Sequence, residues 1–208
     1  MKRWQTLMMS TILGCASVTA FARAELEKGL TPTAISGFIG SQVDNRGAAS
    51  DEHALSLIFA GERYDRPCDL TISKGDLAGN GDSLTTTWDN CITTSAPKVV
   101  GWSNLSRIKV RGIQVCTNNK SNHRMKGIRL YGAEVQEDGD LLYQTGYESF
   151  SRSNCKTWHA AVFCPYGQVA TKLVIHSTDD EVNGLGLKCR RVRGFTPPTG
   201  EFIVPVLR

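Results

Sequence analysis

The sequence predicts an all-β fold, a disulfide-stapled antiparallel β-sheet domain. Three observations carry this prediction: a strand pattern repeated around glycine, an even number of cysteines in the mature chain, and the lack of an amphipathic helical periodicity of convincing length. Short apolar runs separated by Gly, Asn, Asp and Ser clusters are typical of all-β domains. We expect residues 25–208 to form a single domain, with a strand-poor lead-in to about residue 50.

A six-residue pattern occurs three times, with glycine at its third position. The copies are VRGIQV at 110–115, MKGIRL at 125–130 and VNGLGL at 182–187. Side chains of a strand alternate between faces with a period of two, so the apolar residues before and after the glycine are out of phase by one position. A bulge at the glycine returns both apolar sets to one buried face. The pattern therefore predicts a repeated β unit rather than a catalytic loop.

Residues 1–24 have the form of a secretory signal peptide. Lys2 and Arg3 precede an apolar stretch from Leu7 to Phe21, and Ala22-Arg23-Ala24 fits an A-x-A cleavage site. The apolar stretch is interrupted by Ser and Thr and is too short for a transmembrane segment. We expect a secreted or periplasmic protein without a transmembrane segment.

An alternative interpretation of the same region is a lipoprotein signal. Ile12-Leu13-Gly14-Cys15 resembles the bacterial lipobox, in which the cysteine is lipidated and becomes the first residue. The apolar stretch continues beyond Cys15, which favours simple cleavage after Ala24.

Cleavage after Ala24 leaves an even number of cysteines. The six are Cys68, Cys91, Cys116, Cys155, Cys164 and Cys189. In an exported chain they predict three disulfides, with about 15 connectivities open. Because the sequence contains no C-x-x-C pair, neither a zinc ribbon nor a redox motif is indicated, and we expect no metal and no cofactor.

The charge balance gives no indication of a nucleic-acid partner. Of the 24 Lys and Arg residues, Lys2, Arg3 and Arg23 lie in the signal segment, so 21 remain against 20 Asp and Glu. A near-neutral mature chain does not have the basic excess that nucleic-acid binding requires.

The first half of the chain contains few strand signals before residue 54. Within the lead-in, 34–39 is the only strand candidate. Residues 54–60 could form a helix, but their β-rich composition and the following glycine favour a strand. Residues 69–72 predict another strand, and 75–83 a turn-rich loop.

The second half carries strand signals almost throughout. Residues 102–135 are strand-like, and Asp138-Gly139 between apolar runs predicts a hairpin. Residues 169–175 and 185–192 form a last strand pair, and 202–204 an edge strand.

Residues 158–189 resemble the repeat of the vitelline membrane outer layer protein family. The matching features are Trp158, Cys-Pro-x-Gly at 164–167, Asp179-Asp180, Asn183-Gly184 and the closing Cys189. Residues 102–132 resemble the repeat more weakly, with a second copy of its closing strand at 125–132.

The resemblance implies a β-prism, in which sheets pack around a pseudo-threefold axis; a β-sandwich is the other architecture compatible with the strand pattern. It also implies that Cys164 pairs with Cys189. Members of the family are extracellular structural proteins similar to sugar-binding β-prism lectins, so carbohydrate binding follows by analogy of fold.

Aromatic side chains are the first candidates for a ligand site. Sugars stack their apolar faces on aromatic rings, with polar neighbours binding the hydroxyls. The candidates are Trp88, Trp102, Trp158 and Tyr166. For Trp158, which lies near cysteines, packing against a disulfide in the core is the alternative.

Basic side chains are the second candidates. Arg107, Lys109 and Arg111 alternate with apolar residues, which predicts a basic outer strand face. Together with Arg124, Lys126 and Arg129 they could bind an acidic glycan or lipopolysaccharide. The alternative is a solvated face balanced by nearby acidic residues, among them Glu134 and Glu137.

No residue is assigned a catalytic role. The sequence has no Gly-x-Ser-x-Gly motif, and the mature cysteines are expected in disulfides. We expect a binding protein that recognises a glycan or another cell-envelope component. A structural or assembly protein of an envelope or extracellular layer ranks second, and a glycan-active hydrolase third.

Overall fold

The structure, a computed structural model, describes residues 24–27, 33–36, 41–44, 53–63, 66–80, 83–89, 95–119, 124–178 and 181–194. These residues form strands and short connections, and no helix occurs among them. The expected all-β class is therefore confirmed. The signal segment, Cys91, the Asp179-Asp180 pair and the expected strand at 202–204 lie outside the described residues.

The strands form three sheets, and all the pairings between them are antiparallel in the described part of the chain. Sheet I has the order β1 (Thr33–Ser36), β13 (Glu181–Arg191), β12 (Gln168–Thr178), β2 (Ser41–Asp44). Sheet II has the order β10 (Thr157–Trp158), β7 (Ile108–Thr117), β8 (Met125–Val135), β9 (Leu141–Ser151), with β11 (Val162–Phe163) also paired to β7. Sheet III has the order β5 (Ser83–Asp89), β4 (Arg66–Gly75), β3 (Ala54–Arg63), β6 (Ser95–Gly101).

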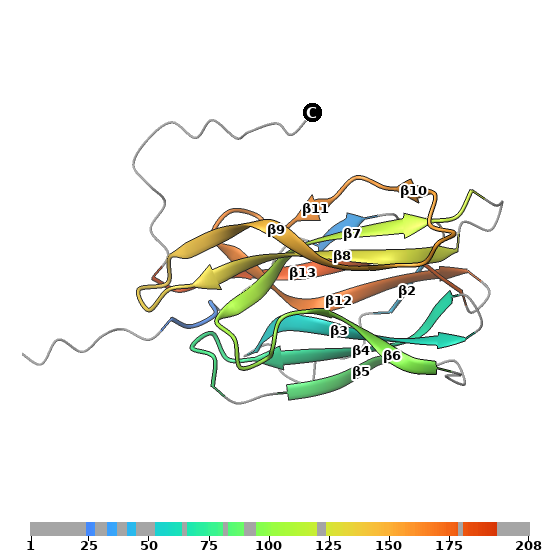
Figure 1. The fold of residues 1–208 in the computed structure, drawn as a ribbon. Coiled ribbons are helices and arrows are strands. Elements are labelled where there is room, and N and C mark those ends of the chain that lie inside the picture. Colours follow the sequence, from blue (N-terminus) through green and yellow to red (C-terminus); the bar gives the residue numbers. More distant parts are fainter. Residues whose placement is uncertain are drawn as a thin grey trace, which may run out of the picture.

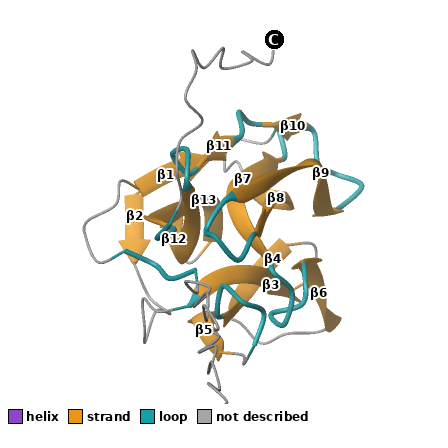
Figure 2. Cartoon of the chain, turned by 90° about the vertical axis from the view of Figure 1, so that its left-hand side faces the viewer, coloured by secondary structure: helices purple, strands orange, loops and turns teal. Residues whose placement is uncertain are grey.

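Each sheet is built around one long hairpin, namely β12–β13, β7–β8 or β3–β4 (Figure 1). Viewed from the side, the three sheets surround a shared interior, with sheet I on the left, sheet II at the upper right and sheet III below (Figure 2). One buried apolar cluster takes Ile58 from sheet III, Ile113 from sheet II and Leu173 from sheet I. This arrangement is a β-prism, as the family resemblance implied.

The bulges expected in the three glycine motifs are present. The strand register shifts in each motif at the residue before the glycine, at Arg111, Lys126 and Asn183. All nine apolar residues of the motifs belong to the same core cluster: Val110, Ile113, Val115, Met125, Ile128, Leu130, Val182, Leu185 and Leu187. The extra residue thus places both apolar sets in one interior, as the phase shift predicted.

The hairpin expected at Asp138-Gly139 joins β8 to β9. Gly139 has φ of 92°, a conformation that glycine adopts without a steric penalty. The Gln136 N–H donates to the Asp140 carbonyl at 2.8 Å and closes the turn. The strand favoured over a helix at 54–60 is also confirmed, as part of β3.

The lead-in contributes two strands, whereas the sequence indicated one. β1 pairs with β13 and β2 with β12, so both edges of sheet I come from this segment. A strand of four residues is too short to show a clear alternation of apolar and polar side chains. Its hydrogen bonds are completed by partners that are distant in sequence.

Two disulfides lie within the described residues. Cys164–Cys189 has a Cα–Cα distance of 5.6 Å and confirms the pairing that the resemblance implied. Cys116–Cys155, with a Cα–Cα distance of 5.7 Å, ties the segment between β9 and β10 to β7. Because Cys91 and the side chain of Cys68 lie outside the described part, the third disulfide stays a prediction.

Candidate functional site

The outer face of sheet II carries a row of planar side chains, hereafter the stacked row. Strands β7 to β11 and the turn after β11 supply its members. In spatial order they are Tyr166, Tyr143, Arg111, Phe163, Tyr131, Tyr147, Arg129 and Trp158.

Two guanidinium groups in the row each contact two aromatic rings. Arg111 Cζ lies 4.7 Å from the ring centroids of both Tyr143 and Phe163. Arg129 Cζ lies 4.5 Å from the Tyr147 centroid and 3.9 Å from that of Trp158. These distances are well inside the range of cation–π attraction, so the rings hold both cations in place.

Ring-to-ring contacts make the row continuous between and beyond the two cations. Tyr131 meets Phe163 edge-to-face at 4.9 Å and Tyr147 at 5.7 Å between centroids. Tyr143 contacts Tyr166 at 5.3 Å and extends the row at its other end. Such edge-to-face pairs stabilise an arrangement beyond the effect of buried area.

Glycines of the repeated motif make room for two of the rings. A Cβ atom added at Gly112 would overlap the Phe163 ring, and one added at Gly127 would lie 3.1 Å from Trp158 Cη2. Phe163 and Gly112 are register partners, and so are Trp158 and Cys116, which itself pairs with Gly127. The glycines therefore allow aromatic rings from β10 and β11 to lie against sheet II.

One amide links the polar groups of the row. The Gln114 Oε1 atom accepts hydrogen bonds from Arg129 Nη1 at 3.2 Å and from the Tyr131 hydroxyl at 3.0 Å. The Gln114 Nε2 group donates to the His159 carbonyl at 2.7 Å. Because both ends of the amide are engaged, Arg129 and Tyr131 keep a fixed orientation.

The two cations of the row have no anionic partner within the described residues. Neither Arg111 nor Arg129 forms an ion pair there, and the Nε group of each is buried without a hydrogen-bond partner. Burial lowers the pKa of Arg111, but a guanidinium titrates so far above neutrality that it stays charged. Burial also raises the pKa of Tyr131 and of Tyr143, so both hydroxyls remain neutral.

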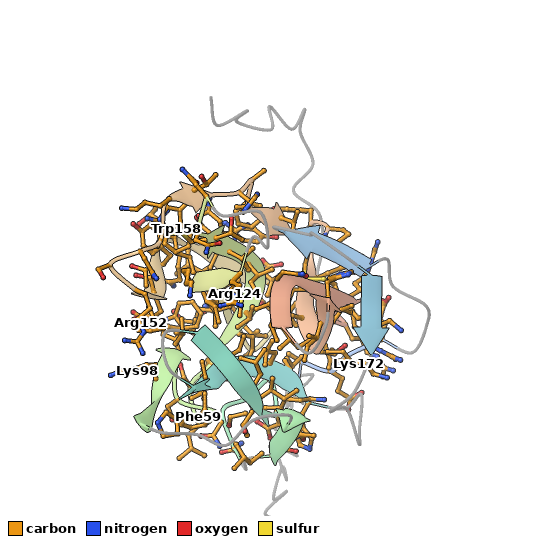
Figure 3. The ribbon with its side chains drawn as sticks, turned by 90° about the vertical axis from the view of Figure 1, so that its right-hand side faces the viewer. Phe59, Lys98, Arg124, Arg152, Trp158 and Lys172 are labelled. Carbon is orange, nitrogen blue, oxygen red and sulfur yellow. A yellow bond between two sulfur atoms is a disulfide. The ribbon has the colours of Figure 1, made fainter. Side chains whose placement is uncertain are left out.

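The row is open to solvent along its edge. Tyr147 and Tyr166 are 46% and 45% exposed, and its other members are half-buried. Trp158 lies at the outer side of sheet II, on the opposite side of the molecule from Phe59 of sheet III (Figure 3). A ligand can therefore reach the rings of Tyr147 and Tyr166, and Tyr147 lies directly against Arg129.

The aromatic residues that the sequence indicated do not all come together. Trp158 and Tyr166 belong to the stacked row. Trp102 instead packs against the core, where a Cβ atom at Gly132 would lie 2.6 Å from its Cη2 atom. Trp88 lies on β5 of sheet III, with its side chain outside the described part.

The expected basic outer face is wrong at Lys109. Its side chain is fully buried, and Nζ donates to Ser56 Oγ at 3.3 Å and to the Asn104 carbonyl at 3.2 Å. Burial lowers the pKa of Lys109 to about 8, partly opposed by the charge of Asp76. The prediction assumed regular alternation, which the bulge between Val110 and Gly112 interrupts.

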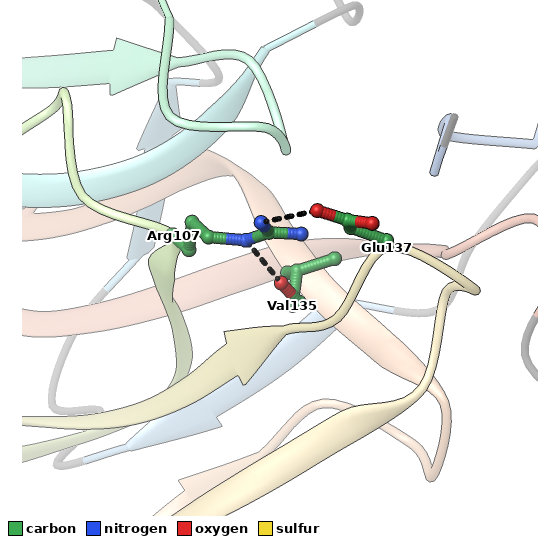
Figure 4. A network of polar contacts seen from close by, with 3 residues as sticks. All are labelled: Arg107, Val135 and Glu137. Atoms are coloured by element: carbon green, nitrogen blue, oxygen red, sulfur yellow. Dashed lines mark hydrogen bonds and ion pairs between the residues drawn. The ribbon is translucent and has the colours of Figure 1, made fainter. Parts of the chain in front are cut away.

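The other two members of that basic set differ from each other. Arg111 lies in the stacked row. Arg107 donates from Nε to the Val135 carbonyl at 2.9 Å and forms an ion pair with Glu137 at 3.5 Å (Figure 4). Its charge is balanced within the chain, as the alternative interpretation anticipated.

Most of the row was not predicted from the sequence. Gln114, Tyr131, Tyr143, Tyr147 and Phe163 were not among the expected site residues, and Arg129 was expected only as part of a general basic patch. No group of three or more His, Cys, Asp and Glu side chains in the described ranges is arranged to hold a metal ion. The same ranges contain no helix long and apolar enough to cross a bilayer.

Comparisons with known proteins identify the class of fold. No family model matches the chain, and no curated protein matches it. Among solved structures, the Calsepa lectin in complex with a bisected glycan aligns with a TM-score of 0.54 and 11% identity, covering 79% of this chain and 100% of that one. The Calystegia sepium agglutinin aligns with a TM-score of 0.51 and 14% identity, over 79% and 99% of the two chains.

A third similar structure is a toxin. The mosquito-larvicidal Cry4Aa toxin from Bacillus thuringiensis aligns with a TM-score of 0.54 and 9% identity, over 81% of this chain but 34% of the toxin. Identities this low show a shared fold alone. The chain is therefore a β-prism protein.

Proposed function

We propose that this protein binds a glycan of a cell surface or envelope, and that it does so at the stacked row on the outer face of sheet II. The observation that carries the proposal is the continuous series of aromatic rings and guanidinium groups, open to solvent along one edge. Aromatic rings present flat apolar surfaces against which the C–H faces of sugars stack.

The polar groups between the rings supply the directional part of recognition. The guanidinium groups donate hydrogen bonds, and the tyrosine hydroxyls can donate or accept them. Sugar hydroxyls need both kinds of partner. The row contains no pair of carboxylates of the kind that glycoside hydrolysis uses, so binding is the chemistry these side chains supply.

The fold supports the same proposal. The Calsepa lectin, whose structure holds a bisected glycan, has a similar β-prism. The two chains are only 11% identical, so fold analogy contributes to the proposal and the composition of the row carries it.

We further propose that the chain is exported after cleavage behind Ala24 and acts as one all-β domain. The signal-like segment and the disulfides support export, because disulfides persist in oxidising compartments. Kinship with the vitelline membrane outer layer family is part of this proposal, supported by the β-prism and by the Cys164–Cys189 pairing.

A glycan array tests the proposal with matched variants. Tyr147→Ala removes an exposed ring of the row, and Leu84→Ala removes a side chain that is 66% exposed on sheet III. We expect wild-type protein to bind a defined set of glycans, and Tyr147→Ala to weaken that binding about threefold to tenfold, the effect of one stacked ring. Leu84→Ala should bind like wild type. Failure of wild type across a broad array, or equal binding by Tyr147→Ala, would refute the proposal.

A further inference from the structure

We propose that the glycan is anionic, and that Arg111 and Arg129 each bind one of its acidic groups, a carboxylate or a sulfate. This inference rests on the proposed glycan-binding function and adds the class of ligand. In this proposal the two guanidinium groups of the stacked row bind the acidic groups, and the rings between them stack against the sugar rings.

Arg111 and Arg129 lack a counter-charge within the described residues. Three other arginines there have carboxylate partners: Arg107 with Glu137 at 3.5 Å, Arg191 with Glu27 at 3.8 Å, and Arg193 with Glu25 at 2.9 Å. Arg111 and Arg129 are half-buried, and aromatic rings take the place of the carboxylates. A partly buried cation without a counter-ion is costly, and an anionic ligand would offset that cost.

The two guanidinium groups have unused hydrogen-bonding capacity. The Arg111 side chain makes no hydrogen bond within the described residues, and the Arg129 side chain makes one, to Gln114. Each guanidinium group already contacts two rings, so a ligand would be bound by its N–H groups. A planar guanidinium presents these donors as a fork that matches the two oxygens of a carboxylate or sulfate.

The groups follow a regular order along the row. Phe163, Tyr131 and Tyr147 separate the two cations, so an apolar surface lies between two charged positions. The row follows the strand direction, since Gln114 and Arg129 are register partners two residues along from the Gly112 and Tyr131 pair. A polymer with acidic groups at intervals fits this order better than a single terminal sugar.

Calorimetry with paired polymers tests the inference. Polygalacturonate and its methyl ester share one backbone and differ in charge, and dextran sulfate and dextran form a second pair. We expect an affinity at least about tenfold higher for the charged member of one pair, weakened by added salt. Tighter binding to polygalacturonate than to its methyl ester would identify carboxylates as the acidic groups that are bound. Tighter binding to dextran sulfate than to dextran would identify sulfates.

Variants locate the charge recognition. We expect Arg129→Met and Arg111→Met each to lower the affinity for the preferred charged polymer about tenfold. Arg107→Met is the matched control, because Glu137 already balances that cation, and it should leave the affinity unchanged. Should a methionine variant fail to fold, the corresponding lysine variant keeps the charge without the fork and should still bind more weakly than wild type.

The outcomes separate the two proposals. Equal affinity for charged and neutral polymers, with unchanged binding by the arginine variants, would overturn the anionic ligand while leaving glycan binding at the row in place. Binding of neither polymer pair by a protein that is positive on the glycan array would overturn the anionic ligand alone. Failure across the array, together with binding to vesicles of anionic phospholipid, would overturn both proposals.

Discussion

Glycine residues in the repeated motif have two separate roles. The phase of the flanking apolar residues predicted the first role, a bulge that brings Val110 and Ile113 into one core. The second role, room for a ring, could not be predicted, because the Phe163 ring reaches Gly112 from a separate strand. The sequence of one strand indicates which of its own side chains face the core. It does not indicate which side chain from another strand will pack against it.

Lys109 illustrates a related limit of sequence analysis. Alternation placed it on the outer face with Arg107 and Arg111, and the bulge makes that alternation invalid. Its amine is buried beside Ser56 and the Asn104 carbonyl. A buried lysine destabilises the fold while it is charged, which makes the stability depend on pH.

We expect the free energy of unfolding to rise as pH increases above about 8. The folded pKa of Lys109 is about 8 against an ordinary value of 10.5, so between these values the unfolded chain binds more protons than the folded chain. Stability therefore increases with pH in this window, by at most about 1.4 kcal/mol per unit, and Lys109 adds no pH dependence below it. Urea unfolding across the window measures the slope.

Lys109→Met is the control for this titration. Removing the amine should flatten the slope while the buried volume stays similar. Readings should stay below the ordinary tyrosine pKa of 10.0, because Tyr131 and Tyr143 titrate above it. An identical slope in wild type and Lys109→Met would show that another group causes the pH dependence.

At the scale of elements, the hairpin was predictable and its register was not. Asp138-Gly139 indicated the turn, and counting back from it would pair Tyr131 with Thr145. A register shift between Tyr131 and Ala133 pairs Tyr131 with Tyr147 instead. That shift brings Tyr147 next to Arg129 in the stacked row. Bulges of this kind depend on packing against other sheets, which one strand pair does not reveal.

The Cys116–Cys155 disulfide lies next to the short strand β10. Cys155 precedes Trp158 by three residues, and the bridge fixes this segment to β7. We expect Cys116→Ser with Cys155→Ser to lower the free energy of unfolding by about 2–4 kcal/mol. The same change should shift the indole N–H resonance of Trp158, because the ring loses its position on Arg129.

The second disulfide provides the matched comparison. Cys164→Ser with Cys189→Ser removes the bridge between the end of β11 and β13, away from Trp158. It should cost similar stability and leave the Trp158 resonance in place. An unchanged Trp158 resonance in the Cys116 and Cys155 variant would show that β10 holds its position without the bridge.

At the scale of the whole molecule, the class of fold was predictable and the assembly of the row was not. Strand spacing and the glycine motifs indicated an all-β chain, and the family resemblance implied the β-prism. The row forms only when β10 and β11 pair with β7, and the paired residues are about forty to fifty positions apart in sequence. Similarly, β1 and β2 complete sheet I by pairing with strands from the other end of the chain. Periodicity within a segment does not determine such distant partners.

An NMR titration can show whether an anionic glycan lies along the stacked row. Isotope-labelled protein would be titrated with short polygalacturonate or dextran sulfate fragments while side-chain N–H resonances are followed. We expect the largest shifts at the guanidinium groups of Arg111 and Arg129 and at the Trp158 indole. Shifts confined to sheet III or to the connections between strands, with these three groups unaffected, would show that the glycan does not bind at the stacked row.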